Sequence, residues 1–164
     1  MDSLTPVAIA LGSNVGNRAT HLEWAVSRLR DLVFPTGGLL VSSTIETAPE
    51  DARSNPPQGD FLNAAVAGHT AMPPRALLEQ LLALEAERGR VRVKPGEPRT
   101  LDLDLILYGA SVIDEPELVV PHPRFRTRTF VLQPLAEIVP GWIDPGSGET
   151  ISELLRKLTA EPPG

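Results

Sequence analysis

The stretch Leu101–Tyr108, with the sequence LDLDLILY, decides the fold because it completes a pattern of elements that begins near the N-terminus. Side chains of a strand alternate between the two faces of its sheet. We therefore expect one face to carry the leucines, Leu101, Leu103, Leu105 and Leu107. The same alternation places Asp102 and Asp104 together on the other face. The stretch predicts a strand with one apolar face and one acidic face.

Five predicted elements precede this strand. Apolar periodicity, β-branched residues and turn residues predict these elements. In chain order they are a strand at Thr5–Leu11, a helix from Asn17 to Val33, strands at Leu39–Thr47 and Phe61–Thr70, and a helix from Pro74 to Gly89. The order β-α-β-β-α-β is typical of an α+β, ferredoxin-like sandwich with its helices on one side of an antiparallel sheet. Residues 109–164 form a C-terminal elaboration, for which we expect a hairpin at 112–119 and helices near 128–137 and 150–158.

Composition limits the classes of function. With 164 residues and 41% hydrophobic residues, the chain suits a single domain over 1–164. It has no cysteine, so any metal must be held by Asp, Glu or His, and a reducing compartment is expected. The N-terminal residues show no signal peptide and no apolar span, which predicts a cytoplasmic protein without membrane contact. The net charge of −6 argues against nucleic acid as a partner.

The positive charges are concentrated in one part of this acidic chain. Of 15 Lys and Arg residues, eight fall between positions 88 and 128: Arg88, Arg90, Arg92, Lys94, Arg99, Arg124, Arg126 and Arg128. Any single arginine is best explained as a solvated surface residue. The cluster, however, favours a compact polyanion such as a triphosphate, which needs several converging cations.

Asp102 and Asp104 are candidate metal ligands. Their positions two apart in a strand put them about 7 Å from each other at the backbone, near enough to share a cation. Magnesium is the natural candidate, because it takes one or two carboxylates and fills its other positions with water and phosphate oxygens. The alternative is an ordinary half-exposed strand with polar residues facing water.

Arg90 and Arg92 follow the end of the second helix and alternate in the loop after Gly89. Phosphoryl-transfer enzymes use such cations to stabilise the transferring group. Complementing the helix dipole would explain one of these arginines, but not the whole group. The turn Gly12–Arg18 matches neither a P-loop nor a dinucleotide fingerprint, so we attribute its glycines to a tight β-to-α turn.

Phe61, Asn63 and Phe130 suggest a flat heteroaromatic substrate. Aromatic faces stack on conjugated rings, and an Asn amide can both donate to and accept from a guanine-like edge. Each Phe taken alone is better explained as a core residue. His122 follows Pro121 in a rigid turn, where its imidazole could donate to a phosphate.

Taken together, six stretches resemble the family of 6-hydroxymethyl-7,8-dihydropterin pyrophosphokinases. They are ALGSNVGNR (10–18), SSTIETAP (42–49), FLNAAV (61–66), LEAERGRVR (84–92), RTLDLDLILYG (99–109) and VPHPRFRTRTFVLQPLAEI (120–138). The resemblance implies a ferredoxin-like fold and transfer of pyrophosphate from ATP to the pterin in folate biosynthesis, with AMP as the second product. It also implies two Mg²⁺ ions. Separately, we expect small-molecule substrates only and a monomer.

The resemblance also implies roles for individual residues. Asp102 and Asp104 correspond to the magnesium ligands, and Arg90 and Arg92 to catalytic arginines that also bind ATP. Further ATP contacts are implied for Glu85, Arg99, His122 and Arg128. The pterin site corresponds to Thr47, Phe61, Asn63 and Phe130.

The chain departs from some family members in three places. Residues 93–98 contain no aromatic residue where some members carry a tryptophan, residues 48–60 are long and polar, and Pro123 stands where some members have tyrosine. Two rival functions stay open from sequence. One is a non-catalytic ferredoxin-like ligand-binding module, and the other is a magnesium-dependent kinase that transfers only the terminal phosphoryl group and releases ADP.

Overall fold

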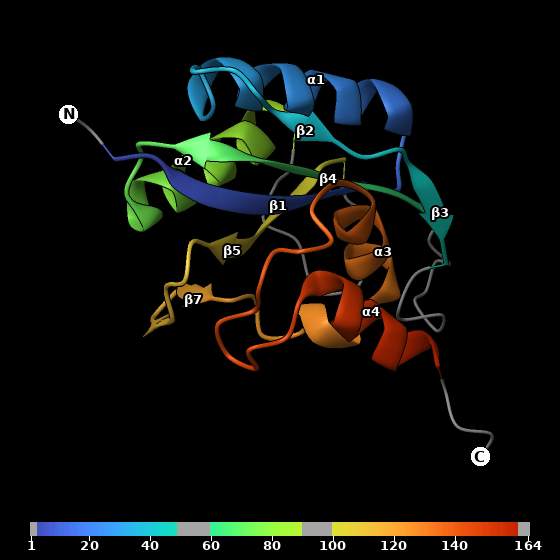
Figure 1. Ribbon diagram of the computed structural model, residues 1–164. Helices are drawn as coiled ribbons and strands as arrows, with labels where there is room; N and C mark the ends of the chain where they lie inside the picture. Colours follow the sequence, from blue (N-terminus) through green and yellow to red (C-terminus); the bar gives the residue numbers. More distant parts are fainter. Residues whose placement is uncertain (1–2, 49–59, 90–99, 161–164) are drawn as a thin grey trace.

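The computed structural model describes residues 3–48, 60–89 and 100–160 (Figure 1). Its elements in chain order are β1 (Thr5–Ser13), α1 (Arg18–Leu32), β2 (Leu40–Val41), β3 (Ile45–Thr47), β4 (Phe61–Thr70), α2 (Pro74–Glu87), β5 (Asp102–Tyr108), β6 (Ile113–Glu115), β7 (Leu118–Val120), a 3₁₀ turn (Phe125–Thr127), α3 (Thr129–Ile138) and α4 (Ile151–Thr159). In the described ranges, no helix is both long and apolar enough to cross a lipid bilayer.

The main sheet is antiparallel, with the order β2-β4-β1-β5, and β3 also pairs with β4. This order confirms the predicted α+β, ferredoxin-like arrangement, in which the first and last strands of the β-α-β-β-α-β unit lie side by side. The predicted strand at Leu39–Thr47 is divided into β2 and β3. The division falls at Ser42, whose Oγ accepts the N–H of Ala65 at 2.8 Å in place of a backbone carbonyl.

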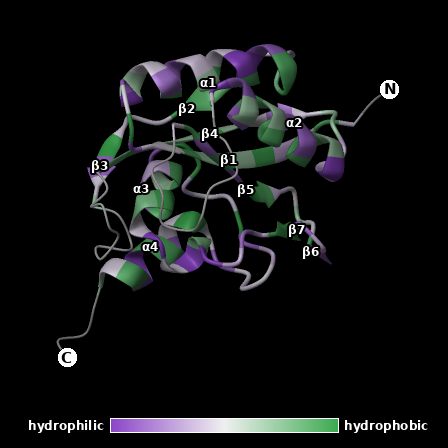
Figure 2. Cartoon of the chain, turned by 180° about the vertical axis from the view of Figure 1, so that it is seen from behind, coloured by the Kyte–Doolittle hydropathy of each residue, from purple (hydrophilic) through white to green (hydrophobic). Residues whose placement is uncertain are grey.

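Helices cover both faces of the sheet, not one. Helices α1 and α2 pack on the first face, around a core that includes Leu22, Leu29, Leu77 and Leu81. The expectation of helices on one side holds for these two, but α3 and α4 of the C-terminal elaboration cover the opposite face (Figures 1 and 2). A second core lies there, with members that include Leu132, Leu135, Ile151 and Leu154. The elaboration is therefore needed to bury that face.

Strand β5 contains an irregularity that changes which face its last residues occupy. Ile9 of β1 pairs with Leu105, but the next partner of β5 is Ala8 opposite Leu107, which leaves Ile106 as an extra residue. Such a bulge interrupts the alternation. Leu103 and Leu105 belong to the core under α1 and α2, whereas Leu107 belongs to the core under α3 and α4. The prediction that Leu107 shares a face with Leu103 is therefore wrong, because the bulge lies between them.

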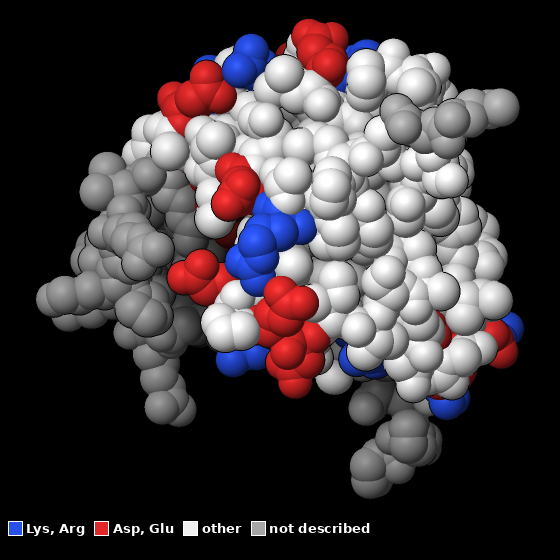
Figure 3. All heavy atoms as spheres, turned by 90° about the vertical axis from the view of Figure 1, so that its left-hand side faces the viewer, with Lys and Arg blue, Asp and Glu red and all other residues white. Residues whose placement is uncertain are grey.

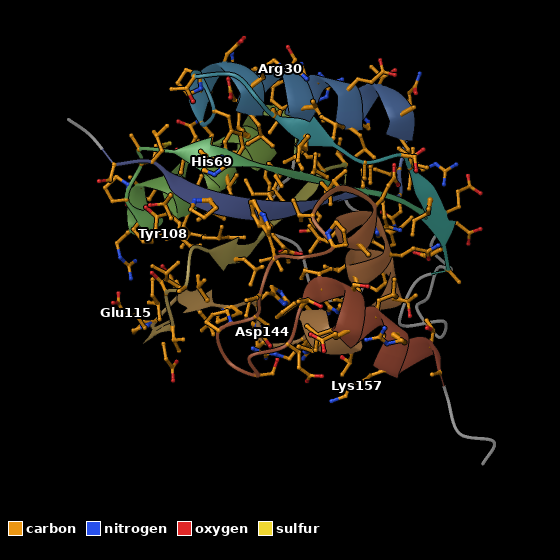
Figure 4. All side chains as sticks on the ribbon, viewed as in Figure 1. Arg30, His69, Tyr108, Glu115, Asp144 and Lys157 are labelled. Atoms are coloured by element: carbon orange, nitrogen blue, oxygen red, sulfur yellow. The ribbon has the colours of Figure 1, made fainter. Side chains whose placement is uncertain are left out.

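The segment between α3 and α4 is organised around one buried carboxylate, that of Asp144 (Figure 4). Asp144 Oδ1 accepts from Arg126 NH2 at 2.8 Å and from the Gly146 N–H at 2.9 Å, and Oδ2 accepts from Ser147 Oγ at 2.7 Å. Burial alone would raise the pKa of Asp144. The hydrogen bonds from Arg126, Ser147 and Gly146 outweigh burial and lower that pKa to about 2.

Candidate functional site

The three neighbouring strands β4, β1 and β5 change from apolar to polar at one level of the face that packs against α3. Along β1 this face carries Ala8, Ala10 and then Gly12, and along β4 it carries Ala67, Ala65 and then Asn63. On β5, Asp104 pairs with Ala10, and Asp102 pairs with Gly12. The small side chains let α3 approach the sheet, and the polar ones gather where the apolar core of that face ends.

Asp102 and Asp104 share this face, as the alternation of β5 predicts, since both lie before the bulge. Both carboxylates are partly exposed, while Leu101 and Leu103 on either side of Asp102 are buried. Within the described residues, no group of three or more His, Asp or Glu side chains is arranged to hold a metal. The two carboxylates on one face are a donor set that fits an ion completed by water and phosphate oxygens, as magnesium prefers.

Glu85 holds the strand that carries the two aspartates. It lies in the last turns of α2, is only 4% exposed, and its Oε2 accepts the backbone N–H of Leu103 at 2.7 Å. Leu103 stands between Asp102 and Asp104. The family resemblance predicts an ATP contact for Glu85. In the structure its carboxylate binds the outer edge of β5, and so helps to fix the aspartate pair.

Replacement of Glu85 should test whether its carboxylate holds β5 in place. We expect Glu85→Ala to lose about 1.5–3 kcal/mol of stability, because the Leu103 N–H loses a charged acceptor in a buried place. We expect Glu85→Gln to recover most of that loss, because its amide oxygen can still accept. Urea unfolding of both variants measures the difference. Equal stability of Glu85→Ala and the parent would contradict this positioning role.

An apolar pocket adjoins the aspartates on the outer side of β5. Its polar lining comes from Glu85, Asp102, Asp104, Glu117 and His122. Its apolar wall comes from three elements, α2, β5 and β7 with the following turn, through Leu78, Leu82, Leu103, Leu105, Leu118, Val119 and Pro123. Sequence reasoning missed this wall. Two signals pointed to it: Leu82 is a leucine on the exposed side of α2, and β7 is a run of three apolar residues, Leu118–Val120, of which Val119 is exposed.

His122 lies at the mouth of this pocket in a fixed position. Its backbone N–H donates to the carbonyl of Ile106 at 3.0 Å, which joins the turn to the bulged part of β5. Its Nδ1 accepts the N–H of Arg124 at 3.2 Å. In the neutral imidazole the proton is then on Nε2, which makes that nitrogen a hydrogen-bond donor. The turn thus orients His122 Nε2, the donor that we expect from the sequence to contact a phosphate.

The residues expected to bind the pterin lie on β3, β4 and α3. Asn63 is buried, and its Nδ2 donates to Thr47 Oγ1 at 2.7 Å. This bond fixes the orientation of the amide. Phe61 lies opposite Thr47 in the β3–β4 pair, on the same face as Asn63. Phe130 is in the first turn of α3, half-buried against the second core, with the Arg128 guanidinium 5.5 Å from its ring centre.

Arg18 is a further residue that sequence reasoning did not single out. It begins α1, and its guanidinium pairs with Glu46 of β3 and donates from NH1 to the carbonyl of Asp60 at 2.9 Å. These contacts tie the short strand β3, which carries Thr47, to the start of β4. No motif would reveal this role, because the partners are 28 and 42 residues away in the chain.

The glycines of the first turn have different roles from those expected. Gly16 has a φ of 70° and does form the tight turn before α1, whose first turn is capped by the Asn17 side chain. Gly12, in contrast, lies inside β1. The interpretation of Gly12 as a turn residue is therefore wrong, because β1 runs two residues further than the apolar stretch indicates.

Part of the predicted site falls outside the described residues. Arg90, Arg92 and Arg99 are among these, as are residues 93–98 and most of the 48–60 segment.

On the side of the molecule shown in Figure 3, acidic and basic side chains lie next to one another among the described residues, and an ion pair joins Arg75 of α2 to Glu115 of β6 at 2.9 Å.

The fold and these side chains together define a class of protein, a small-molecule kinase built on a ferredoxin-like sandwich. Carboxylates, an oriented histidine and an apolar pocket lie at one edge of the sheet, and an oriented amide with aromatic neighbours lies beside them. Comparison with known proteins identifies the family. The chain belongs to the 7,8-dihydro-6-hydroxymethylpterin-pyrophosphokinase family, whose sequence model matches residues 8–140.

Several curated relatives carry the name 2-amino-4-hydroxy-6-hydroxymethyldihydropteridine pyrophosphokinase. The protein of Synechocystis is 39% identical over 153 residues, which cover 92% of this chain and 74% of the relative. That of Methylorubrum extorquens is 41% identical and covers 94% of both chains. That of Bacillus subtilis is 45% identical over 130 residues, covering 79% of this chain and 75% of the relative. These matches confirm the family resemblance seen in the sequence.

A solved structure has the same fold. The crystal structure of wild-type Plasmodium falciparum HPPK-DHPS superposes with a TM-score of 0.74 at 13% sequence identity, over 98% of this chain and 46% of that one. At this identity the match supports the fold alone, and the chain spans less than half of that protein. The family itself is one of folate biosynthesis, whose enzymes transfer pyrophosphate from ATP to 6-hydroxymethyl-7,8-dihydropterin and release AMP.

Proposed function

We propose that this chain carries out pyrophosphoryl transfer with the Asp102–Asp104 pair as its metal-binding element. The observation that carries the proposal is the pairing of these two aspartates with Gly12 and Ala10, which sets both carboxylates on one face beside an apolar pocket. Two Mg²⁺ ions are expected there, which would offset the charge on the ATP phosphates when bound. Magnesium dependence is therefore part of the proposal.

The apolar pocket is the proposed place for the nucleobase of ATP. Leucine side chains of α2 and of the β6–β7 hairpin offer flat apolar surfaces on two sides, through Leu78, Leu82 and Leu118. A base seated between them would direct the phosphates toward Asp102, Asp104 and His122, which line the same pocket. His122 Nε2 would donate to a phosphate oxygen, and Arg128 is proposed as a further ATP contact.

The pterin is proposed to bind beside Asn63. The amide of Asn63 is held by Thr47, so its Oδ1 presents an oriented acceptor to the ring edge of the pterin. Phe61 and Phe130 supply aromatic faces for stacking. The substrate hydroxyl would then attack the β-phosphorus in line, the bond from that phosphorus to the α-phosphate oxygen would break, and AMP and the hydroxyl proton would be released. Arg90, Arg92 and Arg99 are proposed to stabilise the charge on the transferring group.

One experiment tests the function against its two rivals. The protein is incubated with ATP, Mg²⁺ and 6-hydroxymethyl-7,8-dihydropterin, and the nucleotide product is identified. Our proposal predicts AMP, formed only with both the pterin and the metal present. Release of ADP would indicate transfer of the terminal phosphoryl group, and an unchanged nucleotide would indicate a binding module.

Variants of Asn63 and Thr47 test the pterin site. We expect Asn63→Ala to weaken pterin binding by about 10- to 100-fold, because an edge of the substrate loses its hydrogen bond in a buried place. Thr47→Val should give a smaller loss, since it frees the amide to rotate but leaves it in place. Binding of a non-hydrolysable ATP analogue should stay unchanged in both variants. A parallel loss of ATP binding would show that the changes act through the fold.

The proposal also covers the domain organisation, oligomeric state, location and partners of the chain. The chain is expected to act as a single domain over residues 1–164, as a monomer in the cytoplasm, on small molecules and without nucleic acid or membrane partners. The net charge of −6 and the lack of cysteine support these expectations. Light scattering of the purified protein would test the oligomeric state.

A further inference from the structure

The end of α2 is linked to the site and to α1 by two side chains that lie close together in the helix. Glu85 reaches β5, where its Oε2 accepts the Leu103 N–H at 2.7 Å. Arg88 is the last residue of the same turn, and its backbone N–H donates to the Leu84 carbonyl at 3.1 Å. An α-helix has 3.6 residues per turn. A displacement of Arg88 would therefore displace Glu85 as well.

The Arg88 side chain is directed toward α1 and contacts two of its residues. Arg88 Nε donates to His21 Nδ1 at 2.9 Å, and the guanidinium carbon lies 5.0 Å from the centre of the Trp24 ring. His21 and Trp24 are three positions apart, so they share one face of α1. Both are partly buried. The hydrogen bond and the attraction of a cation to the indole ring together hold the arginine in one orientation.

A second link between the two helices is weaker. Arg28 of α1 lies 5.7 Å from the centre of the same Trp24 ring, and its NH2 is 3.3 Å from both carboxylate oxygens of Glu87. Both members of this ion pair are largely exposed, and exposed pairs contribute little to stability. The contacts of Arg88 are therefore the main side-chain connection between the last turn of α2 and α1 within the described residues.

We propose that Arg88 is a positioning residue for the reaction, which holds the last turn of α2 against α1 and so sets the Glu85 carboxylate on β5. The N–H that Glu85 binds belongs to Leu103, which stands between Asp102 and Asp104. Arg88 thus acts on the aspartate pair through Glu85. This inference rests on the proposed function, because the placement of the aspartates affects turnover only if they take part in it.

The contact between Arg88 and His21 requires a neutral imidazole. His21 Nδ1 accepts from Arg88, so the ring proton is on Nε2, and a second proton would occupy the accepting nitrogen. Burial, and then the charge of Arg88, lower the pKa of His21 below its ordinary value of 6.5. The described charged side chains around this contact are Arg88 and Glu87 of α2 and Arg28 of α1. The contact is therefore present at neutral pH and is lost as the pH falls through the lowered pKa.

The experiment compares Arg88→Ala with the parent and with Arg30→Ala. Arg30 is a matched control, because it is an exposed arginine of α1 for which the described residues show no ion pair (Figure 4). In Arg88→Ala we expect hydrogen exchange of the Leu103 amide, followed by NMR, to accelerate at least about tenfold. The Ala65 amide, which Ser42 holds, should exchange as in the parent.

The kinetic readout separates positioning from substrate binding. Misplacement of a reacting group by about 1 Å can cost about 100-fold in rate. We therefore expect kcat of Arg88→Ala to fall at least about tenfold, while KM for the pterin stays within about twofold. Arg30→Ala should match the parent in exchange and in turnover.

His21→Gln supplies a second variant that does not remove Arg88. Its amide oxygen can still accept from Arg88, but it does not titrate. At about pH 8 its kcat should be close to that of the parent, in which His21 is neutral. As the pH falls below 6.5, the parent should lose turnover that His21→Gln retains.

Three results would each overturn the inference. The first is a Leu103 exchange rate in Arg88→Ala within about threefold of the parent. The second is a kcat of that variant within about threefold of the parent. The third is a parallel decline of the parent and His21→Gln at acidic pH. Failure of the proposed function is a separate result, the absence of AMP with the parent protein. Exchange of the Leu103 amide still tests in that case whether Arg88 holds Glu85 in place.

Discussion

Asp102→Asn and Asp104→Asn are each expected to lower kcat by at least about 10³-fold, while the fold is retained. Each substitution keeps the size of the side chain and removes its negative charge. Both carboxylates are partly exposed on the face away from the first core, so neither supports packing. The loss should come from weaker metal binding and from poorer alignment of the phosphates.

A metal titration gives this prediction a second readout. The Mg²⁺ concentration needed for half-maximal binding of a non-hydrolysable ATP analogue should rise at least about tenfold in either variant. The matched control is Asp114→Asn, which removes an exposed carboxylate from β6 and should leave activity and metal dependence unchanged. Full activity of Asp102→Asn or Asp104→Asn would refute the metal-binding role. So would an unaltered Mg²⁺ requirement.

The aspartate pair shows which features of a site can be predicted from sequence. Its geometry depends only on the two-residue period of a strand, and every pairing from Gly12 to Ala10 keeps that period. Three residues later the same reasoning fails for Leu107, because a bulge opposite Ala8 and Ile9 adds one residue. A bulge is a property of two strands together, which one strand's sequence does not encode.

Other parts of the site depend on contacts between distant segments. The hydrogen bond from the Leu103 N–H to Glu85 joins α2 to β5, and the bond from Asn63 to Thr47 joins β4 to β3. The residue types are visible in the sequence as a carboxylate and an amide, but their partners are set by the sheet order and by the packing of α2. The sequence likewise predicts that α3 and α4 are helices, but it does not predict that they cover the second face of the sheet.

Asp144→Asn is expected to have the largest effect on stability, a loss of about 3 kcal/mol in the free energy of unfolding. The Asp144 carboxylate is fully buried and accepts hydrogen bonds from Arg126, Ser147 and the Gly146 backbone. Asparagine would turn one acceptor into a donor that faces the Arg126 guanidinium. Arg126 is about one third exposed, so water can hydrate part of its unpaired charge, which places the loss at the lower end for a broken buried pair.

The pH dependence of stability identifies the cause of this loss. The pKa of Asp144 is lowered from 3.8 to about 2 in the folded protein, so the carboxylate contributes stability that is fully present well above pH 3.8. That contribution, about 2 kcal/mol from the size of the shift, is lost as the pH falls from about 5 to about 2. Asparagine does not titrate. The difference in unfolding free energy between the parent and Asp144→Asn should therefore shrink by about that amount between pH 5 and pH 2.

Urea unfolding at several pH values measures both effects, and a nearby surface pair supplies the control. Glu149 pairs with Lys157 at 2.7 Å, with the lysine largely exposed (Figure 4 labels Asp144 and Lys157). We expect Glu149→Gln to change stability by less than about 1 kcal/mol, because exposed ion pairs contribute little. A loss below about 1 kcal/mol in Asp144→Asn, or a gap to the parent that stays constant from pH 5 to pH 2, would contradict the prediction. With the predicted result, the Asp144 carboxylate is what holds the segment between α3 and α4, and so keeps the second core closed over the sheet face that leads to Gly12.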